Sequence, residues 1–202
     1  YVADGHHRSA AASRVHAQRV GEAGTHDAFL AVVFPLDDVH VMAYNRVVRD
    51  LAGLTEDAFL AAVREHFELA PAGGPVTPSA RHAFGIRLSD GWRTAVARDG
   101  VVDESDALAR LDVSVLQEHV LRPLLGIEDP RTDGRIAFVG GIRGAGEIDR
   151  LVESGAFAVG FTLFPTSTDE LLAAADRGEV MPPKSTWFEP KLASGLFLHP
   201  LL

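Results

Sequence analysis

The chain has 202 residues, of which 47% are hydrophobic and 23% charged, and its formal net charge is −9 at pH 7. This composition is typical of a globular protein and excludes disorder, collagen and coiled coil for the chain as a whole. There is no cysteine, which excludes disulfides, zinc–cysteine sites and a cysteine nucleophile. No apolar run approaches the roughly 20 residues needed to span a bilayer. The acidic balance argues against nucleic-acid binding. We expect a cytoplasmic protein.

The first quarter of the chain alternates apolar runs with turn formers. Residues 1–3 are typical of the end of a buried strand, which predicts that the domain continues upstream of residue 1. The patterns that follow predict a helix at 6–20, a strand buried on both faces at 28–34, a strand at 39–44 and a short helix at 45–52.

The rest of the chain carries clearer start and stop signals. Thr55 is expected to cap a helix, and Ser167 with Glu170 forms a capping box. The further elements expected are a hairpin of 82–88 and 92–98, a helix from Asp112 or Ser114 to Gly126, strands at 135–139 and 156–164 around a helix at 145–154, a helix at 168–177, and strands at 185–189 and 195–199.

These elements predict the fold class. The strand–helix–strand order at 135–164 indicates a βαβ-like unit, whereas the hairpins favour an α+β fold. We expect a mixed sheet with flanking helices, whose amino-terminal part lies upstream of this chain. The Pro- and Gly-rich loop at 70–80 is the expected sub-boundary within 1–202.

The densest polar cluster is Asp4-Gly5-His6-His7-Arg8, where an expected strand turns into a helix. Unpaired backbone N–H groups at a helix start attract anions, and Gly5 permits close backbone approach. Arg8 in the first helical turn could clamp a phosphate. Asp4 could hold a divalent metal or orient an imidazole, and His6 or His7 could carry a proton or contact phosphate. The competing interpretation is that Asp4 is merely a helix N-cap.

A second candidate follows a rigid proline pair near the other end. Lys184 offers a point charge for phosphate, and Ser185 and Thr186 offer hydroxyl donors. The alternative is an edge strand with exposed polar side chains. Asn45 and Arg46 follow an expected strand and could add a guanidinium to the site; a surface salt bridge is the alternative.

The remaining polar motifs are weaker. Gly140–Gly146 lies between a strand and a helix, but its spacing does not match the dinucleotide-binding fingerprint. The histidines at 26, 40, 66, 82, 119 and 199 lack metal-ligand spacing, and we expect them to be structural or solvated.

Three stretches carry a family resemblance. Residues 1–12 (YVADGHHRSAAA) resemble the signature of domain-of-unknown-function family 1015, found in bacteria and archaea. Residues 161–166 (FTLFPT) and 181–198 (MPPKSTWFEPKLASGLFL) resemble its carboxyl-terminal signature. Members of the family are about twice as long as this chain, which implies that the chain is the carboxyl-terminal portion of a larger protein.

The turn at residues 4–8 is also similar to an element of archaeal ADP-dependent free serine kinases and, more distantly, of the ParB/sulfiredoxin superfamily. The resemblance implies a nucleotide (ADP or ATP) with Mg²⁺, with Asp4 serving the metal or substrate and His7 and Arg8 serving phosphate. The kinase's catalytic carboxylate lies upstream of its signature, so its counterpart would precede residue 4.

Three functions remain open from the sequence. The first is phosphoryl transfer to a small hydroxylated acceptor, with Asp4 and His7 catalytic and with Gly5, His6, Arg8, Lys184, Ser185 and Thr186 on the phosphate. The second is a ParB-like nucleotide-binding regulator without transfer chemistry. The third is a structural protein whose motif only caps a helix. The first predicts that the turn and Lys184 meet in one cavity.

Overall fold

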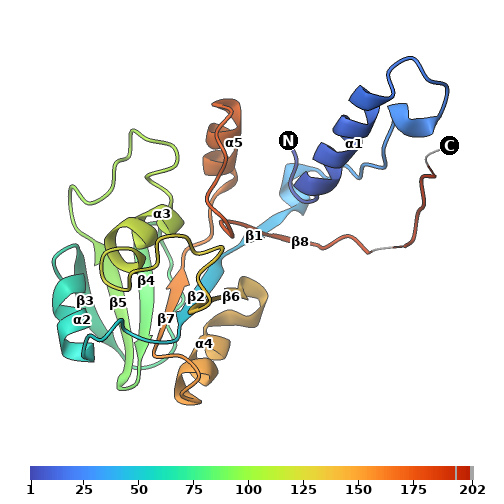
Figure 1. Ribbon diagram of the computed structural model, residues 1–202. Helices are drawn as coiled ribbons and strands as arrows, with labels where there is room; N and C mark the ends of the chain where they lie inside the picture. The colour runs from blue at the N-terminus through green and yellow to red at the C-terminus, as the bar shows by residue number, and fades with distance from the viewer. Residues whose placement is uncertain (194, 201–202) are drawn as a thin grey trace. The chain divides into compact units, whose positions relative to one another are not determined.

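The computed structural model describes residues 1–193 and 195–200. It divides into two compact units, unit 1 (Tyr1–His40 and Phe188–Leu202) and unit 2 (Val41–Trp187). Figure 1 shows the course of the chain through both. None of the described helices combines the length and the apolar character needed to cross a bilayer.

Unit 1 consists of helix α1 (His6–Gln18) and extended segments with short 3-10 turns at Thr25–Asp27 and Leu36–Asp38. The helix confirms the prediction for 6–20. Among the described residues of unit 1 only His26 and Phe188 are buried, and α1 buries none.

Three of the expected strands are absent in unit 1. Residues 1–3, 28–34 and 195–199 have no strand structure, and Val33 within the apolar run is 90% exposed. A strand needs a hydrogen-bonded partner for its backbone, and no described strand pairs with these segments. Strands β1 (His40–Met42) and β8 (Trp187–Glu189) do pair, in a two-stranded sheet, and they cover part of the predicted 39–44 and 185–189.

Unit 2 is built on a six-stranded sheet in the order β3-β5-β4-β7-β2-β6. The strands are β2 (Tyr44–Val48), β3 (Phe67–Ala72), β4 (Ala83–Leu88), β5 (Gly91–Ala97), β6 (Ile136–Gly140) and β7 (Val159–Leu163). Residues 45–52, predicted to be helical, instead contribute most of β2. A strand forms there because β2 has a partner on each side, β6 and β7.

The α+β class is confirmed, but the described pairings of the sheet are all antiparallel rather than mixed. The strand–helix–strand segment β6–α4–β7 explains the difference. Its two strands run in the same direction, as a βαβ unit requires, yet β2 lies between them and is antiparallel to both. The expected unit is therefore present in split form.

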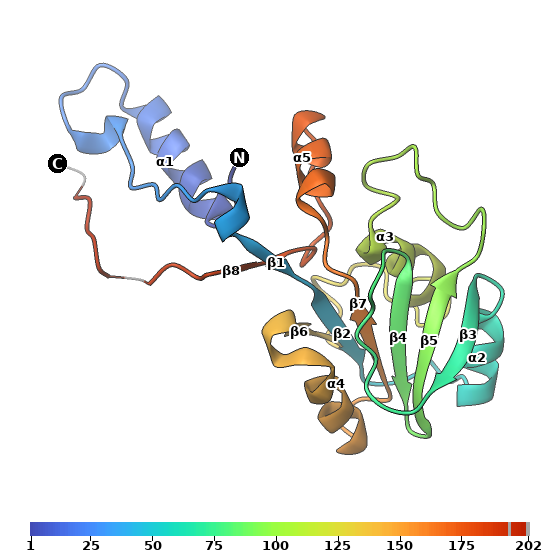
Figure 2. The same cartoon turned by 180° about the vertical axis from the view of Figure 1, so that it is seen from behind.

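Helices α2 (Glu56–Val63) and α3 (Asp112–Leu116) lie on one face of this sheet and α4 (Gly144–Glu153) on the other (Figures 1 and 2). Helix α5 (Thr168–Asp176) follows β7 and lies beyond the end of the sheet. The larger core joins α2 and α3 to one face through side chains such as Phe59, Leu116 and Phe161. The smaller core lies on the α4 side and includes Val47 and Ile148.

The local signals in the sequence locate most of these elements. The Thr55 hydroxyl accepts from the Ala58 N–H, and Ser167 with Glu170 forms the predicted capping box. The hairpin of β4 and β5 is confirmed. The loop at 70–80 lies within unit 2, and its first three residues belong to β3.

Close packing of α4 on the sheet depends on Gly160 in β7. A Cβ atom at this position would lie 2.2 Å from Cγ2 of Ile148 on α4. Neither the Ile148 side chain nor the Gly160 backbone is free to move away, since Ile148 is fully buried and Gly160 is paired with Val47 on β2. The helix can therefore sit this close to the sheet only where the strand has no side chain.

We predict that Gly160→Ala lowers the free energy of unfolding by about 2 kcal/mol, because overpacking a fixed core forces neighbours to move. Gly146→Ala, within α4, is the matched control, since a Cβ there has nothing within 4 Å. Alanine in a helix is favoured over glycine, so the control is expected to be neutral or stabilising by about 0.5 kcal/mol. Urea unfolding measures both; equal effects of the two substitutions would contradict this packing account.

Candidate functional sites

The polar turn at residues 4–8 begins helix α1. Gly5 is the N-cap residue and adopts φ of 87°, in the left-handed region that favours glycine. No described side chain caps the helix, so Asp4 is not its N-cap, contrary to the structural interpretation of the motif. Within the described residues, the first N–H groups of α1 are left without a side-chain acceptor, and the first turn carries no acidic residue.

Asp4 is engaged on both carboxylate oxygens. Oδ1 accepts from the Gly5 N–H at 2.7 Å, and Oδ2 lies 3.2 Å from Nζ of Lys191. The ion pair with Lys191, helped by the Gly5 N–H, holds the pKa of Asp4 below its usual value despite partial burial. The carboxylate is thus fixed in its charged form beside the start of α1.

The basic side chains of the turn face solvent. His6, His7 and Arg8 are all exposed. The Arg8 guanidinium lies back over Gly5, since a Cβ on Gly5 would be 3.2 Å from Arg8 Nε. Arg8 forms no ion pair among the described residues. Arg8 acts on the Asp4 carboxylate through its charge without contacting it. The turn thus combines N–H groups that no described side chain accepts from with an arginine outside any described ion pair, an arrangement suited to an anion.

Asn45 and Arg46 lie on β2 and face opposite sides of the sheet. The Asn45 side chain is buried and accepts from the Leu163 N–H on β7 at 3.2 Å. Arg46 is 3% exposed and donates to the carbonyls of Tyr44 and Lys184. The structure thus separates the two side chains. Arg46 is not the surface salt bridge that was the alternative.

Lys184 lines a cavity of about 320 Å³ in unit 2. Its ammonium group lies 5.4 Å from the centre of the Tyr44 ring. The centres of the Tyr44 and Trp187 rings are 5.2 Å apart. Lys184 forms no ion pair among the described residues. The cavity is also lined by Gly140 and Arg143, so it brings together the Lys184 motif and part of the glycine-rich segment.

The two hydroxyl residues after Lys184 differ in their surroundings. Ser185 is buried and donates to the Pro182 carbonyl at 2.6 Å, while its own carbonyl accepts from the Thr166 hydroxyl. Its hydroxyl therefore closes a turn after the proline pair. Thr186 is half-buried. The turn presents Lys184 in a left-handed conformation, with φ of 56°.

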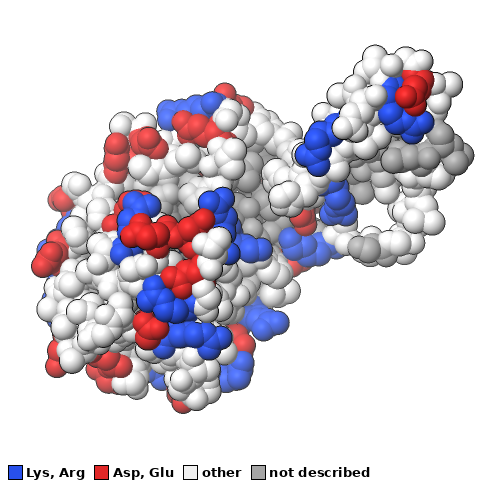
Figure 3. All heavy atoms as spheres, in the orientation of Figure 1, with Lys and Arg blue, Asp and Glu red and all other residues white. Residues whose placement is uncertain are grey.

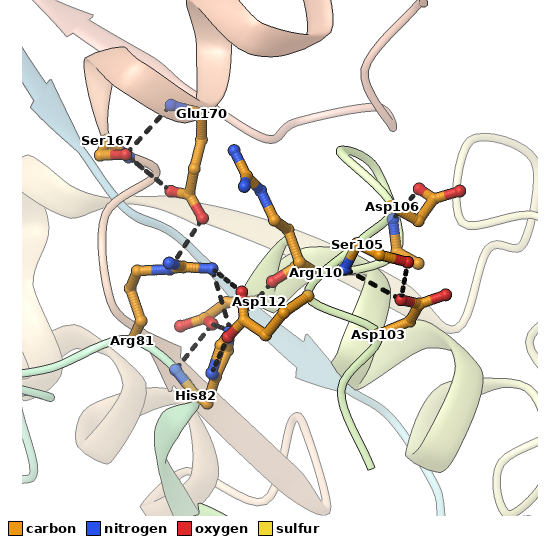
Figure 4. A network of polar contacts seen from close by, with 11 residues as sticks. Arg81, His82, Asp103, Ser105, Asp106, Arg110, Asp112, Ser167 and Glu170 are labelled. Carbon is orange, nitrogen blue, oxygen red and sulfur yellow. Dashed lines mark hydrogen bonds and ion pairs between the residues drawn. The ribbon is translucent and has the colours of Figure 1, made fainter. Parts of the chain in front are cut away.

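A buried polar network lies elsewhere in unit 2, between the start of β4, the start of α3 and the start of α5 (Figure 4). Arg81 Nε lies 2.9 Å from Oε1 of Glu170, which is 4% exposed. The backbone N–H of His82 donates to Oδ1 of Asp112 at 2.8 Å. Nε2 of the His82 ring lies 3.0 Å from the Arg110 carbonyl oxygen. His82 is thus structural, as expected, but the sequence carried no signal that these five residues meet.

Asp112 is the titratable group most affected by this network. Its side chain is 8% exposed, and Oδ2 has no hydrogen-bond partner among the described residues. Burial, reinforced by the nearby charge of Glu170, raises the pKa of Asp112 to about 7, against the opposing effects of the His82 N–H and Arg81. The carboxyl group is therefore partly protonated at neutral pH.

No group of three or more His, Asp or Glu side chains able to hold a metal ion occurs in the part of the chain that the structure describes. Asp4 would hold Mg²⁺ only together with ligand oxygens. Over the face of unit 2 seen in Figure 3, acidic and basic side chains alternate, without a large patch of one sign.

The turn and the Lys184 cavity belong to different units. The expectation that they meet in one cavity stays a prediction.

Comparison with known proteins identifies a family. A family model described as "Protein of unknown function (DUF1015)" matches residues 1–114. No functionally curated protein sequence matches the chain.

Solved structures with a similar backbone include free serine kinase in complex with AMP, at 17% identity and a TM-score of 0.48, and a mutant of that kinase in complex with ADP, at 19% and 0.47. A conserved hypothetical protein from Pyrococcus furiosus matches at 16% identity and a TM-score of 0.48, with 93% of this chain and 68% of that chain covered. This chain spans 66% of the length of the two kinase structures and is itself covered to 93%.

We predict that the free energy of unfolding falls as the pH rises. The fall occurs over the pH range in which Asp112 is still protonated in the folded protein but already ionised in the unfolded chain. The group's pKa is 3.8 in its ordinary state and about 7 when folded, so the loss falls between these values. The substitution Asp112→Asn should remove this pH-dependent loss of stability. Between pH 5 and pH 8 the wild type should lose about 2 kcal/mol more than the variant. Urea unfolding at both pH values measures the difference; parallel curves would show that Asp112 titrates normally.

Proposed function

We propose that this chain, which belongs to the family described as "Protein of unknown function (DUF1015)", is the carboxyl-terminal portion of a nucleotide-dependent phosphotransferase. The reaction class is transfer of a phosphoryl group from ADP or ATP to a small hydroxylated acceptor, as in free serine kinases. The phosphate site is the turn at residues 4–8, whose sequence resembles an element of those kinases.

The observation that carries the proposal is the uncapped start of α1. Within one turn lie backbone N–H groups that no described side chain accepts from, two exposed histidines, and an exposed arginine that forms no ion pair in residues 1–193 or 195–200. A helix start favours negative charge, and arginine can donate two parallel hydrogen bonds to a phosphate. The positive φ of Gly5 supports this use, because a side chain there would be strained and would crowd Arg8.

The roles of the residues follow from what phosphoryl transfer requires. Positioning and neutralisation of charge supply most of the catalysis in such reactions. We assign His6, Arg8 and the Gly5 backbone to binding phosphate, and His7 to the charge that develops during transfer. Asp4, already ionised, is the residue that would hold Mg²⁺ together with phosphate oxygens or orient the acceptor hydroxyl. Mg²⁺ in place of Lys191 would again give the Asp4 carboxylate a cationic partner.

The Lys184 cavity supports a second contact with the nucleotide. It presents a lysine without an ion-pair partner, an arginine and the rings of Tyr44 and Trp187, and no carboxylate lines it. Cations suit a phosphate and aromatic rings suit a base. We assign Lys184 to phosphate and Thr186 to a supporting hydroxyl donor. Ser185, whose hydroxyl already donates to Pro182, is assigned to holding the turn.

A nucleotide-binding regulator of ParB-like type is the second candidate. One observation favours it: Asp4 is engaged on both oxygens, by Gly5 and Lys191, and is not free to act as a base. This candidate shares the phosphate site and differs only in the absence of turnover. Incubation of the full-length protein with labelled ADP or ATP and a set of amino acids distinguishes the two.

We predict that Arg8→Ala weakens binding of ADP about tenfold, because the substitution removes charge-assisted hydrogen bonds to phosphate. Binding of adenosine should change little, since it offers no phosphate. Isothermal titration of the full-length protein in the presence of Mg²⁺ measures both. Lys184→Ala should also weaken the binding of ADP. ADP should change the tryptophan fluorescence of the wild type but not that of Trp187→Phe.

Arg14→Ala is the matched control for Arg8→Ala, because Arg14 is an exposed arginine on the same helix outside its first turn. It should bind ADP as the wild type does. Equal loss in both variants would indicate general electrostatic attraction, and unchanged binding in Arg8→Ala would exclude the turn as a phosphate site.

A further inference from the structure

A second cavity of unit 2, with a volume of about 430 Å³, lies between β2, α3 and the segment Val180–Pro183. Its volume lies within the range of small-molecule sites. Arg46 lines it, as do Gln117 and Ser114 from the helix that begins at α3. None of these three residues belongs to the phosphate site proposed above.

The position of Arg46 in the sheet is unusual for an arginine. On the strands to either side its register partners are Phe138 and Phe161, and Phe161 is in turn paired with Ile86. The guanidinium carbon lies 5.5 Å from the centre of the Phe138 ring. The positive charge of Arg46 thus lies between two aromatic residues in its row of the sheet.

This charge has no counter-charge within reach. Arg46 donates to the carbonyls of Tyr44 and Lys184, and it forms no ion pair with a carboxylate in residues 1–193 or 195–200. Burial lowers the pKa of Arg46 to about 10, so the group remains charged at neutral pH. A buried charge without a partner is strongly unfavourable. Two of its five N–H groups are used, which leaves donors for a further partner.

A second unsatisfied atom belongs to the same cavity. Gln117 Nε2 donates to the Ile127 carbonyl at 2.7 Å, whereas Gln117 Oε1 is buried without a hydrogen-bond partner among the described residues. Gln117 begins a π-helical turn, Gln117–Leu121, that continues α3. Such turns often occur at functional sites. The residues that line the cavity therefore include one buried cation, Arg46, and one side chain, Gln117, whose buried acceptor has no partner among the described residues.

The charged residues at the mouth of the cavity already pair with one another. Arg122 pairs with Glu118 and Glu128, and Arg131 pairs with Asp129 at 2.9 Å. All five side chains are at least 36% exposed. They do not supply the missing counter-charge of Arg46, which lies in the interior.

We propose that this cavity binds a small organic oxyanion, a carboxylate or a phosphate, whose charged group pairs with Arg46 and whose hydroxyl or amino group donates to Gln117 Oε1. The ligand supplies the two partners that the fold leaves out. Met181, Pro182 and Val113 provide apolar contacts for its carbon atoms.

The test is isothermal titration of the full-length protein with acetate, glycolate and inorganic phosphate at constant ionic strength. Glycolate adds to acetate only the hydroxyl that Gln117 would accept. We expect saturable binding in the millimolar range, with glycolate tighter than acetate, and a loss of tenfold or more in Arg46→Met. The order of phosphate and glycolate shows which oxyanion the cavity prefers.

Two further variants keep the test decisive, since Arg46→Met also removes donors to two carbonyls and could impair folding. Ser114→Trp leaves Arg46 in place and fills the cavity, so it should abolish binding. Gln117→Met should make glycolate and acetate bind equally. Arg98→Met is the control for loss of an arginine, because Arg98 pairs with Glu68 at the surface of the same unit. It should bind as the wild type does.

Binding that persists in Ser114→Trp, or equal loss in Arg98→Met, would show general attraction of anions and overturn the proposal. The absence of saturable binding by glycolate and phosphate in the wild type would overturn it as well. Arg8→Ala should leave this binding unchanged and Ser114→Trp should leave the effect of Arg8→Ala on ADP unchanged, so failure of one site is distinguishable from failure of the other.

Discussion

Arg46 carries a positive charge into the interior of unit 2, where it contacts the Phe138 ring and donates to the carbonyls of Tyr44 and Lys184. The hydrogen bond to Lys184 ties β2 to the turn that follows the proline pair. The same side chain therefore lines one cavity and holds the backbone of the lysine that lines the other. Because hydrogen bonds to a charged donor are stronger than neutral ones, the arrangement of both cavities depends on this guanidinium.

The Lys184 cavity depends in addition on the absence of a side chain at Gly140. A Cβ atom there would lie 2.5 Å from the Trp187 ring, which rests on the backbone of β6. The contact between the rings of Tyr44 and Trp187 follows from this close approach. The glycine-rich segment thus begins with a residue needed for packing. Its contribution to the cavity is the space it leaves for aromatic rings, together with Arg143 in its middle.

How much the sequence predicts depends on the range of the interactions involved. Caps such as Thr55 and Ser167 involve neighbours within one turn and were located correctly. Residues 45–48 were predicted helical because local patterns cannot reveal that β6 and β7, about 90 or more positions later, flank them. The opposite error occurred at 28–34, where an apolar run typical of a strand has no described partner. Arg46 was noted as polar, but its burial could be learned only from the sheet register.

Two buried ionisable side chains in unit 2, Asp112 and Arg46, respond differently to burial, and only Arg46 is assigned to a ligand site. Desolvation acts on both Asp112 and Arg46, and it raises the pKa of the first to about 7 and lowers that of the second to about 10. Asp112 can therefore relieve its burial by taking up a proton near neutral pH, without an external partner. Arg46 would have to lose a proton with a pKa far above neutral, so it stays charged. Loss of a proton does not relieve the cost of burying Arg46 at neutral pH, so an anion bound in the adjoining cavity would supply the counter-charge that the described residues do not.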